Sequence, residues 1–281
     1  MSHSVRIDKQ LLIAAIGIAA SALTAGVLGI IETYTGFALY SLMFWFILPV
    51  GAVIAGFGAA SGYYIGARLF NQKPAGGIAM NMLLASISAY LLVHYIPYYL
   101  LEIDDGTRIK DIISFWRYLD IDIRSASISF RGGLSTGELG STWGYLYAFL
   151  QLIGFSFGSL IVFSVLSNIP YCEKCSKYLT QTNTQKRYTS NADNLSEKIQ
   201  TFATLLNERQ YVKALEFYST KMGSYQNGNH VLRTQLTTHK CKTCNKNHFE
   251  FVASRLSKND WQDIEKTRIR LWVDPQLDAS P

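Results

Sequence analysis

Charged residues are absent from four long stretches of this 281-residue chain. The uncharged stretches lie between Lys9 and Glu32, between Glu32 and Arg68, between Lys73 and Glu102, and between Glu138 and Glu173. Each one can hold the roughly 20 apolar residues that cross the hydrocarbon core of a bilayer. The sequence therefore predicts a polytopic α-helical membrane region with four transmembrane helices, over about residues 10–31, 42–67, 77–101 and 143–168.

The predicted spans also lack ionisable groups at depth. Proton-coupled transporters, voltage sensors and intramembrane enzymes place such groups there, so these classes are disfavoured, while an uncharged pore remains open. We interpret His94 as an interfacial hydrogen-bonding histidine rather than a metal ligand or proton relay, and Asn81 and Gln151 as interhelical hydrogen-bonding groups. The chain contains no G-x-S-x-G, H-E-x-x-H, P-loop or Gly-rich dinucleotide motif, and we expect no enzymatic activity.

The charged residues that do occur are divided unevenly. Residues 169–281 carry 17 Lys and Arg against 11 Asp and Glu, which accounts for the whole formal net charge of +6, whereas residues 1–168 are neutral overall. This shift predicts two domains: a membrane domain over 1–168 and a cytoplasmic domain over 169–281.

Basic residues in the short segments predict the orientation of the spans, because Lys and Arg concentrate in cytoplasmic loops. Arg6 and Lys9 precede the first span, and Arg68 and Lys73 lie between the second and third. We expect a multi-pass protein of the plasma (inner) membrane with both termini in the cytoplasm and the loop 102–141 on the outer side.

Local sequence features refine the membrane region. Pro49 and Pro97 are expected inside spans, where neighbouring groups can satisfy a freed carbonyl. The outer loop is expected to hold a helix near 110–119 and a strand near 125–130. The small residues at 20–22 resemble a signal-peptide cleavage site, which is the alternative to a retained first span.

Small residues recur at four-residue spacing along three of the predicted spans, which lets helix backbones approach closely. They are Gly58, Gly62 and Gly66 in the second span, Gly154 and Gly158 in the fourth, and Gly17, Ser21, Ala25 and Gly29 in the first. We predict helix packing within one chain, with a homo-oligomeric contact as the alternative.

Cysteine is scarce, and its placement is specific. The four cysteines form two C-x-x-C pairs, Cys172 with Cys175 and Cys241 with Cys244. Two such turns complete the tetrahedron of thiolates that Zn²⁺ prefers, so we predict one structural zinc site. Disulfides conflict with a cytoplasmic domain, a redox dithiol needs no second pair, and an iron–sulfur cluster is the remaining alternative.

The residues around the pairs extend this prediction. β-forming residues lead into and out of the second pair, and His239 and His248 flank it as neighbours rather than ligands. In this pattern residues 170–187 and 230–273 resemble the zinc-ribbon superfamily. Leu195, Ile199, Phe202 and Leu206 repeat at helical spacing, as do Tyr211, Leu215, Tyr218 and Met222, so a helical hairpin is expected as an insert over about 193–222.

The function that we expect follows from the charge and the metal. A fully thiolate-ligated zinc has no open position for substrate, and Lys266, Arg268 and Arg270 form a basic surface suited to docking. We expect a non-catalytic membrane-anchored scaffold, adaptor or regulatory subunit that binds a protein partner or an anionic lipid surface. The alternatives are a homo-oligomeric pore or uncoupled transport component gated by the zinc domain, and a membrane-tethered nucleic-acid-binding protein.

Overall fold

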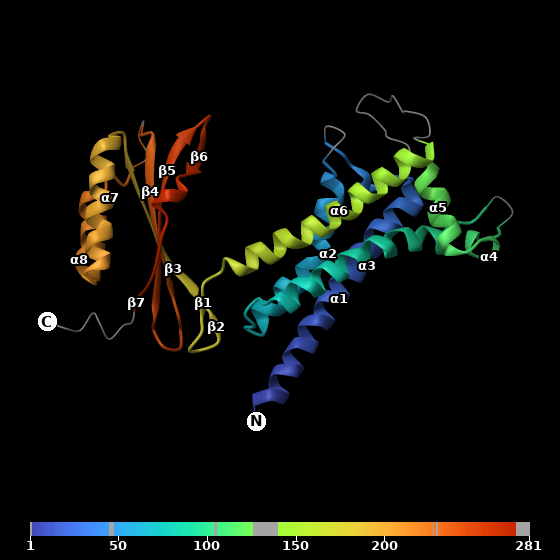
Figure 1. Ribbon diagram of the computed structural model, residues 1–281, viewed down its shortest axis with the longest axis horizontal. Coiled ribbons are helices and arrows are strands. Elements are labelled where there is room, and N and C mark those ends of the chain that lie inside the picture. Colours follow the sequence, from blue (N-terminus) through green and yellow to red (C-terminus); the bar gives the residue numbers. More distant parts are fainter. Residues whose placement is uncertain are drawn as a thin grey trace. The chain divides into compact units, whose positions relative to one another are not determined.

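The structure is a computed structural model that describes residues 2–44, 48–103, 106–125, 140–226, 228 and 230–273. The chain divides into two compact units, Met1–Asn168 and Ile169–Pro281 (Figure 1). The division falls where the composition of the sequence changes from neutral and apolar to basic and polar.

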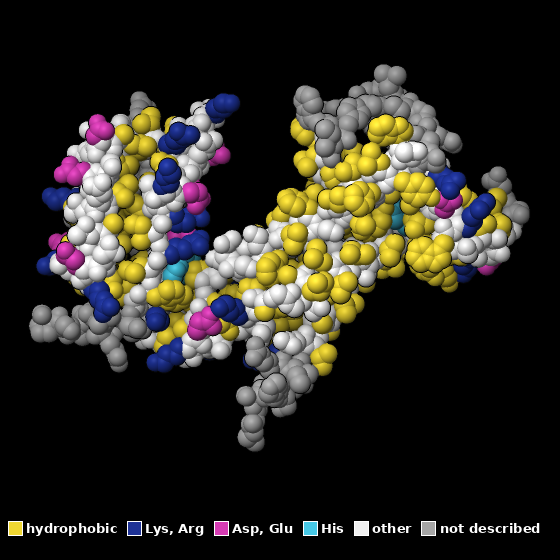
Figure 2. All heavy atoms as spheres, in the orientation of Figure 1, with side chains coloured by type: hydrophobic (Ala, Val, Ile, Leu, Met, Phe, Trp, Pro, Cys, Tyr) yellow, Lys and Arg dark blue, Asp and Glu magenta, His cyan; other side chains and the backbone are white. Residues whose placement is uncertain are grey.

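Four long helices build the N-terminal unit: α1 (Ser2–Thr35), α2 (Val50–Leu69), α3 (Gly76–Leu100) and α6 (Gly140–Ser167). Each contains a segment that is long and apolar enough to cross a membrane, so the prediction of four helices of this kind is confirmed. In Figure 2 hydrophobic side chains cover most of the visible surface of these helices. Pro97 lies inside α3, as expected.

The second helix begins later than predicted. Residues 42–44 and 48–49 are not helical, and Pro49 directly precedes α2, which starts at Val50. Proline disfavours helical backbone in the residue before it and is well placed at a helix start, where its missing N–H costs nothing. The preceding chain instead forms the short 3₁₀ helix η1 (Leu39–Ser41), which buries Tyr40 against the bundle.

Glycines on α2 and α6 lie at close helix contacts within the chain. Gly58, Gly62 and Gly66 face α1, and a Cβ added at Gly62 would lie 2.5 Å from the carbonyl oxygen of Ile16. Gly154 and Gly158 face α2, where the added Cβ atoms would meet Pro49 or backbone atoms. These five positions are therefore occupied by intramolecular contacts.

Two short helices cover one end of the bundle. They are α4 (Ile109–Ile112) and the amphipathic α5 (Phe115–Ser125), so the single helix expected near 110–119 is broken at residues 113–114. α5 packs against α3 and α6. The strand expected near 125–130 lies outside the described residues apart from Ser125, which ends α5.

The C-terminal unit contains an antiparallel sheet. The strands are β3 (Thr180–Thr189), β4 (Leu232–Lys240), β5 (Asn247–Ser257), β6 (Asp260–Asp263) and β7 (Ile269–Val273). Their order is β3-β4-β5-β6, and β7 pairs with the other half of the β5 edge, beside residues 247–251. A separate short hairpin, β1 (Tyr171–Cys172) and β2 (Lys177–Tyr178), precedes the sheet, and η2 (Glu265–Thr267) precedes β7.

Two helices cover one face of this sheet: α7 (Ala192–Asn207) and α8 (Tyr211–Lys221), inserted between β3 and β4 (Figure 1). The side chain of Asn191 caps α7 by accepting from the N–H of Asn194 at 3.0 Å. Phe202 on α7, Tyr218 on α8 and Phe251 on β5 meet in the core between helices and sheet. Side chains alternate along β5, so the residues on either side of Phe251 point to the opposite face of the sheet.

Candidate metal centre

The two cysteine pairs meet although 72 positions separate Cys172 from Cys244. Hairpin β1–β2 holds Cys172 and Cys175, and the turn between β4 and β5 holds Cys241 and Cys244. The register of β3 against β4 pairs Thr180 with Lys240, which brings the two turns together at one end of the sheet. Within the described residues the four sulfur atoms form a cluster in which all lie within 4.8 Å of one another.

Both turns have the same local geometry. The residue that follows each second cysteine is left-handed, with φ of 50° at Ser176 and 59° at Asn245. Backbone N–H groups then point at the sulfur atoms: the N–H of Cys175 donates to Cys172, and those of Thr243 and Cys244 donate to Cys241. Such donors stabilise thiolate, the form that binds a metal ion.

The pKa values of the thiols show how the cluster behaves without a cation. Burial by itself raises the pKa of Cys241, but hydrogen bonds from the N–H groups of Cys244 and Thr243 and with the thiols of Cys244 and Cys172 together outweigh it and lower the pKa to about 6. Hydrogen bonding with Cys244, together with burial, raises the pKa of Cys175 to about 12. One thiolate is therefore favoured and further ionisation is opposed, so a bound cation is needed to hold all four as thiolates.

The arrangement fits Zn²⁺. Four sulfurs at about 2.3 Å from a tetrahedral ion lie about 3.8 Å apart, and the sulfur atoms of Cys172 and Cys244 are 3.7 Å apart. Cys172 and Cys241 are buried and pack with Leu179 in a small apolar cluster. If all four cysteines bound a tetrahedral ion, they would fill its four coordination positions.

The two histidines beside the second turn lie next to the centre and outside the four-sulfur cluster. His239 and His248 are paired across β4 and β5, with ring centroids 5.9 Å apart. His248 is buried and packs on Trp272 at 4.7 Å. Burial and neighbouring His239 lower the pKa of His248 to about 4, so its imidazole is neutral at physiological pH and serves packing.

Of the predicted basic docking surface, formed by Lys266, Arg268 and Arg270, only part is free of ion pairs with neighbouring carboxylates. Arg268 forms ion pairs with Asp263 and Glu265, each at 3.1 Å, and Arg270 pairs with Glu250 at 3.0 Å. Lys266 is exposed and forms no ion pair among the described residues. The charges of the two arginines are therefore already balanced by carboxylates within the unit.

A second set of basic residues surrounds the metal centre. The exposed lysines next to the cysteines, called the metal-end lysines below, are Lys174, Lys177, Lys240 and Lys242. Basic residues around the cysteine pairs and in the closing strand are both visible in the sequence, and the predicted docking surface was placed on the closing strand. The pairing of Arg270 with Glu250 depends on the register of β5 and β7 and could not be read from spacing, whereas the partners of Arg268 are its sequence neighbours Asp263 and Glu265.

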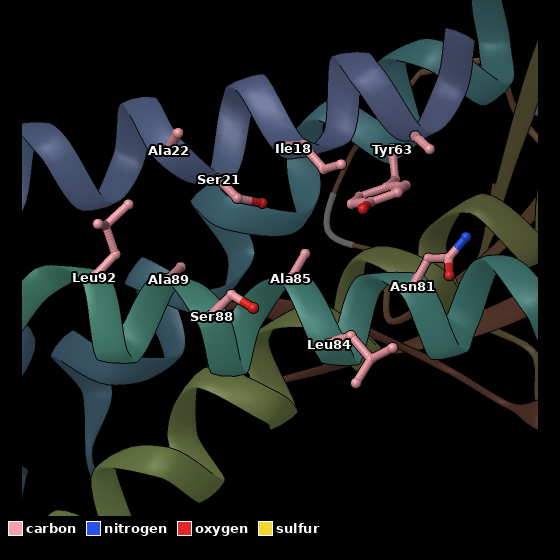
Figure 3. A pocket seen from close by; sticks show the side chains of 11 residues that line it. Ile18, Ser21, Ala22, Tyr63, Asn81, Leu84, Ala85, Ser88, Ala89 and Leu92 are labelled. Carbon is pink, nitrogen blue, oxygen red and sulfur yellow. The ribbon is translucent and has the colours of Figure 1, made fainter. Parts of the chain in front are cut away.

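A cavity of about 430 Å³ lies between α1 and α3 in the N-terminal unit (Figure 3). Its lining is mainly apolar, with polar contributions from Ser21, Tyr63, Asn81 and Ser88. The hydroxyl of Ser21 lies within hydrogen-bonding distance of the carbonyls of Gly17 and Ala59. Asn81 lines this cavity, and none of the lining residues is charged.

Gln151 on α6 lies outside the lining of the cavity and donates a hydrogen bond to the hydroxyl of Ser41 at 3.0 Å.

The pairing of His94 with Asp122 was not predicted from the sequence. His94 is not a lone histidine, because Asp122 from α5 lies 2.9 Å from its Nδ1. The available signal was Asp122 itself: it follows Phe115 and Tyr118 at helical spacing and so shares the apolar face of α5. An acidic residue on an apolar face needs a partner.

Comparisons with protein-family models, with curated proteins and with solved structures found no match. The function is therefore argued from the geometry of this chain alone.

Proposed function

We propose that this protein is a non-catalytic, multi-pass membrane protein in which four transmembrane helices anchor a zinc-stapled docking unit. One observation carries the proposal: the sulfur atoms of the four cysteines lie within 4.8 Å of one another in the C-terminal unit, and the first of them follows a membrane-compatible helix almost directly. A metal used in this way stabilises a fold and performs no reaction. The unit then acts as a scaffold, adaptor or regulatory subunit.

The zinc-ribbon superfamily is the assignment that we propose for the metal-bearing part, residues 170–187 and 230–273. Support comes from two hairpin turns with matching left-handed residues and from strands that lead directly into and out of the second turn. The thiolate donors favour Zn²⁺ over harder cations such as Mg²⁺ and Ca²⁺. An iron–sulfur cluster is the competing occupant, and the absorbance and metal content of the purified protein separate the two.

The short link between the units supports a docking role at the membrane. Only residues 168–170 separate α6 from β1, and three residues extend about 10 Å at most. From this short link we infer that anionic lipid headgroups are the partners of the metal-end lysines. Each Lys near an anionic leaflet contributes about 1 kcal/mol of attraction, which favours a cytoplasmic location for this unit and for both termini.

The first experiment measures this contact in the full-length protein. In nanodiscs that contain anionic lipid, the metal-end lysines should be protected from an amine-reactive reagent, and in neutral nanodiscs or at high salt they should react, because salt screens exposed charges. Lys213 on α8 and Lys258 at the β5–β6 turn are exposed and serve as internal controls that react equally in both. Equal protection in both lipids would contradict docking to headgroups.

The second experiment tests the adaptor role. We expect a partner to co-purify from native membranes after crosslinking, and to be lost in the double variant Lys240→Glu/Lys242→Glu but retained in Lys213→Glu/Lys258→Glu. Zinc content should be unchanged in both variants. Recovery of the same proteins with either variant would argue against a basic docking surface. Ion flux through the purified protein in liposomes would favour the pore instead.

Orientation is tested separately. A cysteine placed at Thr107, in the loop proposed to lie outside, should react with an impermeant thiol reagent in intact cells, and one placed at Ser4 should react only after permeabilisation. The reverse pattern would place the C-terminal unit on the outer side. The cysteines could then form disulfides, and the reason for preferring zinc to disulfides would no longer hold.

A further inference from the structure

The cavity between α1 and α3 is elongated along the two helices (Figure 3). Its lining extends from Asn81 to Leu92 on α3 and from Ala14 to Ala22 on α1. At a rise of 1.5 Å per residue, these stretches are about 16 Å and about 12 Å long. The volume of about 430 Å³ lies within the range of small-molecule sites. A cavity of this length suits a chain-like ligand better than a compact one.

The cavity opens to the side of the bundle. Ile18 and Ala22 on α1 line it and are also exposed, as are Leu84 and Ser88 on α3. If α1 and α3 span a bilayer, as proposed, this opening faces the hydrocarbon chains of lipid. None of the lining residues is charged, and an unpaired charge enclosed there would be costly. The enclosed part of a ligand must therefore be neutral.

One buried hydroxyl in the lining lacks a partner. The side chain of Tyr63 extends from α2 into the space between α1 and α3 (Figure 3). Tyr63 is only 3% exposed, yet its hydroxyl has no hydrogen-bond partner among the described residues. A buried tyrosine hydroxyl usually finds a partner. The cavity is where the missing acceptor would lie.

A glycine on α1 makes room for this tyrosine. A Cβ added at Gly17 would lie 2.3 Å from Cε2 and Cζ of Tyr63, so a larger residue at this position would displace the ring. Ser21 lies one turn further along α1, and its hydroxyl is already satisfied by the carbonyls of Gly17 and Ala59. The helix packing therefore brings the Tyr63 hydroxyl to the cavity without supplying an acceptor for it.

A second donor lies at the same end of the cavity. Asn81 lines the cavity beside Tyr63 (Figure 3), and its amide has no hydrogen-bond partner among the described residues. It follows Gly76, the first residue of α3, by about 7 Å along the helix axis. That depth is close to the boundary between headgroups and hydrocarbon. The other end, near Ala89 and Leu92, is apolar, so the cavity has a polar end near the membrane surface and an apolar end deeper inside.

We propose that the cavity between α1 and α3 binds one ester-linked acyl chain of a membrane glycerolipid. The chain lies along the apolar lining, and the ester carbonyl accepts hydrogen bonds from the hydroxyl of Tyr63 and the amide of Asn81, because a carbonyl oxygen has two lone pairs. An ester suits the site better than a carboxylate, since the lining offers no cation. The inference rests on the proposed membrane location of the helices and is independent of the docking role of the C-terminal unit.

The test compares dipalmitoyl phosphatidylcholine with its ether-linked analogue, which lacks the carbonyl oxygens. Native mass spectrometry of the full-length protein in detergent counts the lipid retained. Wild type should bind the ester lipid more tightly than the ether lipid, by about fivefold for each hydrogen bond gained. Tyr63→Phe keeps the ring and loses the donor, so this preference should fall about fivefold. Tyr64→Phe, on the same helix but outside the lining, is the matched control and should keep the wild-type preference.

A second pair of variants tests the location of the site. Ala22→Phe places a large side chain at the cavity and should lose most of the bound lipid, whereas Ala19→Phe, exposed on α1 but outside the lining, should retain it. Equal retention in these two variants would overturn the proposal. So would equal binding of both lipids by wild type, or an unchanged preference in Tyr63→Phe, and the bound lipid would then be the ordinary layer around the helices. Because binding is measured in detergent, its outcome is separate from that of the cysteine labelling, which tests the membrane location itself.

Discussion

Each of the two units of this chain is stabilised internally by a different kind of contact. In the N-terminal unit the helices meet through small residues, with Gly62 against the backbone of α1 and Gly56 against that of α6. In the C-terminal unit large aromatic side chains fill the space between helices and sheet, and four cysteines close one end. The difference reflects the proposed solvent of each. Lipid gives helices no hydrophobic reason to associate, so close packing decides there, whereas water drives apolar burial.

The comparison has a second side, in the use of polar groups. The C-terminal unit balances its charges on the surface, through ion pairs such as Arg270 with Glu250. The N-terminal unit instead pairs the buried His94 with Asp122, and Glu32 with Tyr40. A polar group that is shielded from water must find its hydrogen-bond partner inside the protein. Removing one member of such a pair therefore leaves the other without a partner.

The largest expected effect is loss of the metal. Cys241→Ser removes a buried ligand, and structural zinc contributes about 10 kcal/mol or more of binding free energy to folding. We expect the C-terminal unit to lose zinc and become sensitive to protease, while the four helices stay folded. Metal analysis and limited proteolysis provide the readout, with Thr243→Ala in the same turn as control. Unchanged zinc content and protease resistance in Cys241→Ser would rule the site out.

Next in size is truncation of the aromatic core. Phe251 is 1% exposed and contacts Phe202 and Tyr218, so Phe251→Ala should destabilise the C-terminal unit by about 3–5 kcal/mol. Hydrogen exchange of the backbone amides of β4 and β5 measures this loss of stability. Leu256→Ala, at a 40% exposed position on the same strand, should cost much less. Equal losses would mean that this core does not hold the unit together.

A smaller loss is expected when a close helix contact is filled. Gly62→Leu places a side chain against Ala20 and the carbonyl of Ile16, and overpacking of this kind costs about 1–3 kcal/mol. Gly26→Leu on α1 is the control, because nothing lies within 4 Å of an added Cβ there. Thermal unfolding in detergent should fall for the first variant only. If the two variants unfolded at the same temperature, close packing at Gly62 would not stabilise the helices, and the contrast in packing between the two units would be wrong.

The smallest effect concerns one hydroxyl. Tyr218 donates to the carbonyl of Gln185 at 2.9 Å or that of Thr234 at 3.1 Å, which joins α8 to the sheet. Tyr218→Phe should lower the free energy of unfolding by about 1 kcal/mol. Tyr211→Phe, also buried but without a hydrogen bond from its hydroxyl among the described residues, should be near neutral. Denaturant unfolding of the zinc-loaded protein distinguishes them.

Features that depend on local sequence could be predicted. The absence of charge predicted the four helices, and the spacing of the cysteines predicted a cluster that could hold a metal ion. Leu195, Phe202 and Leu206 predicted the buried face of α7. Pro49 was placed inside a helix because apolar length was weighed above the preference of proline for a helix start.

Features that depend on distant contacts could not. Gly56 belongs to no regular glycine repeat that would mark it, yet it lies against Phe155. The pairing of His94 with Asp122 joins positions 28 residues apart through a turn of the chain between α3 and α5. Lys266, Arg268 and Arg270 looked alike in sequence, and the pairing of Arg270 with Glu250 depends on the register of β7 against β5.

The meeting of two distant turns at the metal also sets an order of events during synthesis. A ribosome that adds about 5–20 residues per second makes Cys244 several seconds after Cys172, because 72 positions separate them. For that interval the first pair, which follows α6 in the sequence, has only half of the proposed ligand set. Capture of a metal ion by all four cysteines can therefore take place only after the chain has been made through Cys244.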